Sequence, residues 1–78
     1  MKINCFGIAR DITQSDHCEM DNSKIKNVSD LRIELNKKYG QFATIKSYMI
    51  AINQEYATDD QLISERDEIA IIPPVSGG

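Results

Sequence analysis

The C-terminal segment over residues 73–78 is the part of the sequence whose residue types best suit chemistry. It reads Pro-Pro-Val-Ser-Gly-Gly. Each proline fixes φ at about −65° and removes a backbone donor, so Pro73 and Pro74 should end a strand and hold the chain extended. Gly77 and Gly78 have no Cβ atoms, which lets this segment pass through a narrow channel. We therefore expect a flexible tail whose reactive group is the carboxylate of Gly78.

A terminal carboxylate is inert until another enzyme activates it. Adenylation with ATP would give an acyl adenylate, which accepts sulfur to form a thiocarboxylate or an amine to form an amide. The chain has 78 residues, and a domain this small buries only about 60% of the surface that its unfolded chain exposes. We therefore expect a partner to supply the catalytic cavity, and we expect this chain to bind no cofactor of its own.

Three other side chains could act as nucleophiles or metal ligands: Cys5, His17 and Cys18. We interpret Cys5 as a core residue, because it alternates with Ile3 and because free cysteines are among the most buried residue types. A persulfide or thioester on either cysteine is the alternative. His17 and Cys18 are adjacent and too few for a closed zinc site, so we predict no metal site.

The charges exclude some partners. Nine basic and twelve acidic residues give a net charge of −3, and residues 59–78 hold five acidic residues against one basic residue. Nucleic-acid binding requires clustered Lys and Arg, so we expect no nucleic-acid partner. No segment approaches the ~20 consecutive apolar residues of a membrane span, so we expect no membrane partner. The chain does not open on a signal-peptide pattern, which predicts a cytoplasmic protein.

Hydrophobic spacing predicts one α+β domain over residues 1–78, with one main amphipathic helix packed on one face of a sheet. The helix is expected over 28–39: Asn27 can cap it, and apolar residues follow at spacings of three and four. These residues are Val28, Leu31, Leu35 and Tyr39. Strands are expected over residues 2–9, 17–21, 48–52, 56–57 and 69–72, and a loop is expected over 41–47.

Two of the expected strands are apolar on both faces, although one helix can cover only one face. In the first strand, Ile3 and Cys5 alternate with Phe6 and Ile8, and the last strand reads Ile-Ala-Ile-Ile over 69–72. Strands with two apolar faces are usually covered by other structural elements on both sides. We therefore predict an exposed apolar sheet face that binds a partner. The alternative is that the loop over 56–63 folds across this face.

Three stretches carry a resemblance to a known family. FGIARDI over 6–12, interpreted as strand, resembles a Phe-x-x-x-Arg-Glu-Leu pattern, and AINQEYA over 51–57 resembles an Ala-Val-Asn-Gln run. The most specific stretch is DEIAIIPPVSGG over 67–78. Over nearly its whole length the chain resembles the ubiquitin-like β-grasp sulfur carriers, and most closely the small subunits of molybdopterin synthase. The resemblance implies a β-grasp fold with a mixed sheet.

The resemblance also implies a reaction. An ATP-dependent adenylyltransferase resembling the ubiquitin-activating enzymes would adenylate Gly78, and a sulfur donor would convert the adenylate to a thiocarboxylate. The charged tail would enter the large subunit of molybdopterin synthase, which holds a cyclic pyranopterin precursor. Two such transfers would build the dithiolene of molybdopterin. The family precedent is a heterotetramer, in which a dimer of large subunits carries one sulfur carrier at each end.

The family's partner surface corresponds to particular residues of this sequence. Phe6, Ile72 and the tail would line the interface with the large subunit, and Arg10 occupies the family's arginine position, where it would make a polar contact. The tail residues in question are Pro73, Pro74, Val75, Ser76 and Gly77.

The sequence departs from the family pattern at Arg66, where a glycine is usual. If that turn needs a positive φ, Arg66 costs on the order of 1 kcal/mol; otherwise the turn has changed type. Two other functions stay open. One is a sulfur carrier for the thiazole of thiamine, although those carriers are usually shorter and lack a PPVSGG ending. The other is a ubiquitin-like modifier joined to lysines through Gly78.

Overall fold

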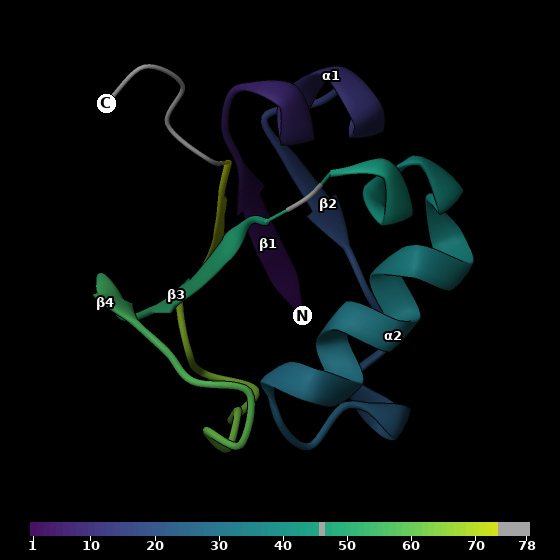
Figure 1. Cartoon of the computed structure of the whole chain (residues 1–78). Helices are drawn as coiled ribbons and strands as arrows, with labels where there is room; N and C mark the ends of the chain where they lie inside the picture. Colours follow the sequence, from purple (N-terminus) through teal and green to yellow (C-terminus); the bar gives the residue numbers. More distant parts are fainter. Residues whose placement is uncertain (46, 74–78) are drawn as a thin grey trace.

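Five strands form one mixed sheet in the order β2-β1-β5-β3-β4 (Figure 1). The computed structural model describes residues 1–45 and 47–73, except for the side chain of Asn22. The central strand β5 pairs in parallel with β1 and antiparallel with β3. The strands are β1 (Lys2–Cys5), β2 (His17–Glu19), β3 (Met49–Ile52), β4 (Glu55–Tyr56) and β5 (Ile69–Ile72). The mixed sheet predicted from the sequence is confirmed.

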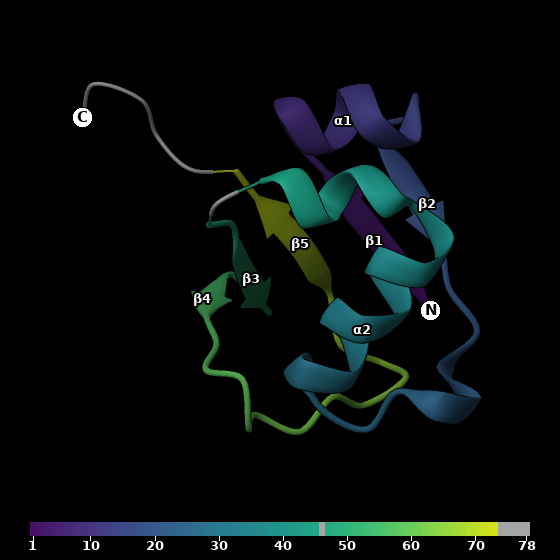
Figure 2. The same ribbon diagram turned by 45° about the vertical axis from the view of Figure 1, so that its right-hand side comes forward.

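The helix α2 (Val28–Lys38) covers one face of this sheet (Figure 2). Its boundaries agree with the expected 28–39 to within one residue. The side chain of Asn27 caps it by accepting a hydrogen bond of 2.8 Å from the backbone N–H of Asp30. Val28, Leu31 and Leu35 are fully buried. The amphipathic helix is thus confirmed, as are three of the four residues of its core stripe; the fourth, Tyr39, follows the helix and is half-buried.

The hydrophobic core lies between α2 and the sheet. The short 3-10 helix η2 (Gly40–Thr44) closes one end of the core, where a loop had been expected. This segment is ordered because Phe42 is buried, with its ring centroid 6.0 Å from that of Tyr39 and 5.5 Å from that of Tyr48. Among the described residues, none of the helices has the length and apolar character needed to cross a membrane.

The strand expected over 2–9 ends early, at Cys5, and that prediction is wrong beyond this residue. Gly7 turns the chain with φ 56° and ψ −129°, and the backbone N–H of Ala9 donates to the carbonyl of Phe6 at 3.1 Å. The chain then forms the helix α1 (Ile8–Thr13). The segment 6–12 is therefore a turn and a helix rather than a strand. Ile8 belongs to α1 and not to a sheet face.

The turn that contains Arg66 does not need a glycine. Arg66 is not among the residues with positive φ. The backbone N–H of Asp67 donates to the carbonyl of Ser64 at 3.0 Å, and the carboxylate of Asp67 accepts from the N–H of Ser64 at 2.7 Å. Arg66 is thus accommodated in this turn without the backbone strain of a positive φ.

The loop that follows β4 runs to the N-terminal end of α2. Backbone N–H groups of Val28 and Ser29 donate to the carbonyls of Gln61 and Asp59, at 3.1 and 2.9 Å, and the N–H of Ile63 donates to the carbonyl of Lys26. The loop therefore packs beside the helix (Figure 1). The alternative in which residues 56–63 fold across the second sheet face is wrong.

Candidate functional site

The sheet face opposite α2, which we call the open face, is built by strand alternation. Along β5, Ile69 and Ile71 point into the core, so Ala70 and Ile72 lie on the other side. The register places Met49 opposite Ile72 and Ala51 opposite Ala70. Apolar side chains from β3 and β5 therefore lie side by side on the open face, and the predicted two-sided strand is confirmed in β5.

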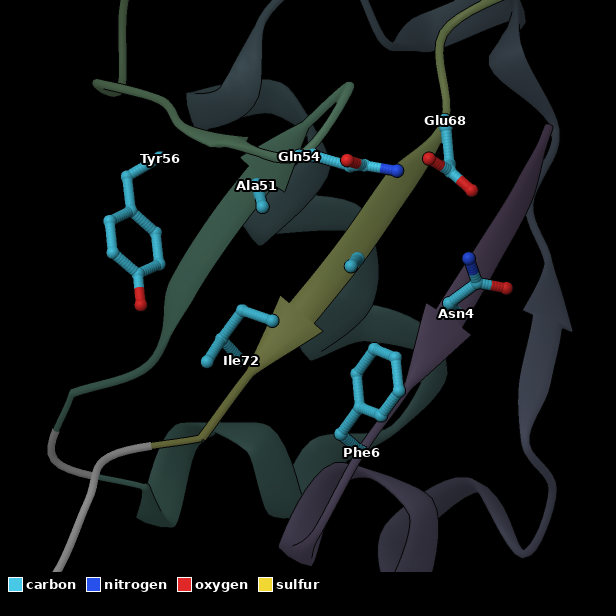
Figure 3. Close-up of a pocket in the computed structure, with 8 residues that line it drawn as sticks. Asn4, Phe6, Ala51, Gln54, Tyr56, Glu68 and Ile72 are labelled. Carbon is cyan, nitrogen blue, oxygen red and sulfur yellow. The ribbon is translucent and has the colours of Figure 1, made fainter.

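A shallow hollow of about 350 Å³ occupies the middle of the open face (Figure 3). In the figure, Phe6 and Ile72 lie toward one end of it, while Gln54 and Glu68 lie toward the other. The end that holds Phe6 and Ile72 is the end at which β5 finishes, next to Pro73. The lining residues are Asn4, Phe6, Ala51, Gln54, Tyr56, Glu68, Ala70 and Ile72.

Large aromatic side chains stay exposed at this hollow. Phe6 is 51% exposed and Tyr56 is 70% exposed. Two exposed aromatic rings beside the exposed Met49 and the half-buried Ile72 form the kind of apolar patch that protein-binding surfaces expose. Phe6 and Ile72 were both predicted to lie on such a face, and the structure brings them together in one hollow.

The polar end of the hollow is fixed by the turn between β3 and β4. Asn53 and Gln54 form this turn with φ of 54° and 70°. Asn53 ties it to the start of β5: its side chain accepts from the N–H of Glu68 at 2.9 Å and donates to the Asp67 carboxylate at 3.0 Å. Gln54 is therefore held in the left-handed region, with its side chain at the rim of the hollow.

Arg10 lies beside the open face rather than on it. Its Nε is 2.8 Å from Oδ1 of Asp16, and both side chains are exposed. Arg10 lines a second hollow of about 330 Å³, which shares Asn4 and Phe6 with the first. Phe6 thus stands between the apolar surface and the guanidinium group. The three residues predicted to contact a partner, Phe6, Arg10 and Ile72, occupy two adjoining hollows.

The tail is described only at its first residue. Pro73 is half-buried and follows β5 directly. Pro74, Val75, Ser76, Gly77 and Gly78 lie outside the described residues, so the position of the reactive carboxylate stays a prediction. The structure places the start of the tail at the end of the open face that holds Phe6 and Ile72.

The two cysteines are buried and free. Cys5 is 2% exposed, and its thiol donates to the carbonyl of Ile3 at 3.7 Å. Burial, followed by the neighbouring Cys5, raises the pKa of the Cys18 thiol to about 12. The thiolate is the nucleophilic form, so Cys18 stays unreactive near neutral pH. The interpretation of Cys5 as a core residue is confirmed. Within 1–45 and 47–73, no three His, Cys, Asp or Glu residues gather as a metal site would require.

Comparison with known proteins assigns the chain to a family. The family model described as the ThiS family matches residues 3–78. The chain belongs to the ThiS family. A molybdopterin synthase sulfur carrier subunit from Arabidopsis thaliana is 33% identical over 100% of this chain and 82% of its own length. A protein of the same name from Dictyostelium discoideum is 38% identical, over 99% of this chain and 94% of its own length.

Solved structures agree on the fold of this ThiS-family chain. A putative molybdopterin converting factor, subunit 1, from Pyrococcus furiosus superimposes with a TM-score of 0.84 at 24% identity, covering 95% of each chain. A chain from a complex of subunits 1 and 2 of the molybdopterin-converting factor from Helicobacter pylori superimposes with a TM-score of 0.67 at 23% identity, covering 99% of this chain and 96% of that one. The fold is the ubiquitin-like β-grasp.

Several residues of the open face were not found by sequence reasoning. Tyr56 had been assigned only to a returning strand and Gln54 to the turn before it, Asn4 had been given no role beyond the first strand, and Glu68 had been interpreted as a solvated turn residue. A strand of two residues, as β4 is, is too short to show an alternation that would assign a face to Tyr56. The one usable signal was Asn53, a residue type that tolerates the positive φ of a tight turn.

Proposed function

We propose that this chain is the sulfur carrier subunit of a molybdopterin synthase. The observation that carries the proposal is the similarity to two molybdopterin synthase sulfur carrier subunits over 99% or more of this chain. The PPVSGG ending and the apolar open face beside Pro73 support it, because a carrier needs a reactive terminus and a docking surface next to it. The established part is the family and the fold; the reaction is our proposal.

The chemistry would begin at the Gly78 carboxylate. An adenylyltransferase uses ATP to form the acyl adenylate with release of pyrophosphate. A sulfur donor then supplies hydrosulfide, which attacks the acyl carbon; AMP leaves, and a thiocarboxylate remains on Gly78. ATP belongs to the activating enzyme, and this chain supplies the substrate carboxylate at the end of a thin arm. The two glycines suit this role because they let the backbone enter a narrow active site.

The partner proposed for the open face is the large subunit of the synthase. Phe6 and Ile72 would be buried against it, and Arg10 would make a polar contact at the edge. The tail from Pro73 to Gly77 would then enter the active site of the large subunit. In Helicobacter pylori, subunits 1 and 2 of the molybdopterin-converting factor form a protein–protein complex. A heterotetramer with one carrier at each end of a large-subunit dimer is the assembly that we propose.

Sulfur transfer would take place in the large subunit on a cyclic pyranopterin precursor. Each thiocarboxylate sulfur would displace a protonated oxygen substituent from a carbon of the precursor. Water would then cleave the bond between this sulfur and the acyl carbon of Gly78, which returns Gly78 to a carboxylate. Two carriers are therefore consumed for one dithiolene. We place the protein in the cytoplasm.

Complementation tests the proposal against its two alternatives. The chain is expressed with its cognate large subunit and adenylyltransferase in cells that lack a molybdopterin synthase small subunit, and molybdopterin is quantified. We expect synthesis with the full chain and none after deletion of Gly78. Rescue of a thiamine-requiring strain without molybdopterin synthesis would favour the thiazole carrier. Recovery of the chain only as lysine adducts would favour a protein modifier, and either result would overturn the proposal.

A further inference from the structure

The turn between β1 and α1 touches the first residue of the tail. At Gly7, a Cβ atom built on the backbone would lie 2.7 Å from Cγ of Pro73, 3.6 Å from its Cβ and 3.8 Å from its Cδ. The proline ring therefore lies directly against the bare Cα of Gly7. No other described glycine is in this position: a Cβ added at Gly40 would meet nothing within 4 Å.

Both partners in this contact are rigid. Gly7 has φ 56° and is held by its neighbours, because the N–H of Ala9 donates to the carbonyl of Phe6 and the N–H of Asp11 donates to that of Gly7. Pro73 has a closed ring that cannot rotate away, and the residue before it is fixed in the sheet by the pairing of Ile72 with Met49. The clash with an added methyl group could be relieved only by a change in the pucker of the proline ring or by movement of the backbone.

The contact between Gly7 and Pro73 lies between the proposed docking surface and the start of the tail. Gly7 follows Phe6, which lines the hollow of the open face, and it lines the second hollow together with Arg10. Pro73 follows Ile72, another lining residue of the open face. The same contact therefore relates the docking surface to the point at which the tail begins.

We propose that Gly7 is a positioning residue for sulfur transfer: its bare Cα seats the Pro73 ring and sets the direction in which the chain leaves the sheet. This inference rests on the proposed function. The tail begins at Pro73, so this direction decides where the tail meets the entrance of the partner's active site. A misplacement of about 1 Å can lower a rate by about 100-fold when reacting atoms must meet in a fixed geometry.

An alanine at position 7 would disturb this seat, the contact between the bare Cα of Gly7 and the Pro73 ring, in two separable ways. It would strain the backbone, because an L-residue rarely adopts φ 56°. It would also push Pro73 away by at least 0.7 Å, from 2.7 Å to an ordinary contact near 3.4 Å. Only the second effect depends on the proline ring. A double-mutant cycle with Pro73→Ala therefore isolates the seat from the backbone strain.

The experiment compares Gly7→Ala, Pro73→Ala, the double variant and the control Gly40→Ala. Each carrier is prepared with a chemically installed Gly78 thiocarboxylate and mixed with the large subunit and the pyranopterin precursor. Single-turnover rates are measured as a function of large-subunit concentration, which separates the maximal rate from half-saturation. We expect Gly7→Ala to lower the maximal rate by tenfold or more with less than a threefold change in half-saturation, and we expect Gly40→Ala to behave as wild type.

The cycle decides whether the seat is responsible. With alanine at position 73, Gly7→Ala should lower the maximal rate by less than threefold. A folded Gly7→Ala carrier with the wild-type rate would overturn the inference, and so would an equal loss in both backgrounds. If Gly7→Ala does not fold, Pro73→Ala is compared with Pro74→Ala, which also removes one proline from the tail: a maximal rate at least twofold below that of Pro74→Ala supports the contact with Gly7, and equal rates refute it. A wild-type carrier that transfers no sulfur would instead refute the proposed function.

Discussion

Phe6 and Ile33 offer a matched pair for testing whether the open face binds the large subunit. Phe6 is 51% exposed on the open face, and Ile33 is 50% exposed on α2, the helix that covers the opposite face of the sheet. A phenylalanine side chain has about 200 Å² of surface, so about 100 Å² remains for a partner to bury. At about 25 cal/mol per Å², complete burial contributes about 2.5 kcal/mol.

The perturbation is Phe6→Ala, with Ile33→Ala as its control. Loss of about 2.5 kcal/mol corresponds to a rise of about 60-fold in the Kd for the large subunit, which is an upper limit because burial at the interface need not be complete. Both side chains are half-buried within the domain, so both truncations should lower its stability to a comparable degree.

Isothermal titration calorimetry with the cognate large subunit measures the two Kd values at a temperature where both variants are folded, as thermal unfolding establishes. We expect Phe6→Ala to weaken binding by between tenfold and 60-fold, and we expect Ile33→Ala to leave the Kd within twofold of wild type. Equal Kd values for Phe6→Ala and wild type would refute the assignment of the open face. So would a loss at Ile33 as large as the loss at Phe6.

Three further predictions concern single residues. Gln54→Gly should raise the unfolding free energy by up to about 1 kcal/mol, because glycine adopts the φ of 70° without strain; a lower thermal midpoint than that of Gln54→Ala would contradict this. The raised pKa of Cys18, from 9.0 to about 12, means that the folded state favours the protonated thiol. The stability from this group should be complete below pH 9 and be lost toward pH 12, by about 1.4 kcal/mol per pH unit. Cys18→Ala should show a shallower slope than wild type in pH-dependent urea unfolding, with a residual slope because burial also raises the pKa of Tyr48. Equal slopes would refute the assignment. Deletion of Gly78 should abolish adenylation by the activating enzyme and leave the thermal midpoint unchanged, since Ile71 is the last core residue in the described part of the chain. A large drop in the midpoint would show that the tail stabilises the domain.

The elements with a clear hydrophobic period could be predicted from the sequence. The helix α2 shows spacings of three and four, and its cap Asn27 is a residue type that favours this position. The alternation of Ile69 and Ile71 with Ala70 and Ile72 gave the two faces of β5, and with them the open face. In both cases the local pattern and the tertiary packing agree, which is why local reasoning was sufficient.

The turn at Gly7 shows where a local pattern misleads. Phe6 and Ile8 continue the alternation of Ile3 and Cys5, and a strand over 2–9 was the natural interpretation. The positive φ of Gly7 ends that strand, and Ala9 is buried on the helix that follows. Phe6 was nevertheless predicted correctly to lie on an exposed surface, although it does so beside a turn and not within a strand.

Other features depend on contacts between segments far apart in the sequence. Phe42 is buried because it packs against Tyr39 and Tyr48. The sequence around Phe42 has no regular hydrophobic spacing that would predict this burial. The seat of Pro73 on Gly7 joins the first turn of the chain to the end of its last strand. A sequence shows the residue types at both positions, but the parallel pairing of β1 with β5 is what brings them together.

Sulfur transfer itself tests the central claim most directly. The carrier is loaded as a Gly78 thiocarboxylate, its intact mass is confirmed, and it is mixed with the cognate large subunit and the cyclic pyranopterin precursor. We predict that molybdopterin forms, that two carriers return to the carboxylate mass for each dithiolene, and that omission of the precursor leaves the thiocarboxylate intact. A loaded carrier that binds a competent large subunit and forms no dithiolene would contradict the account.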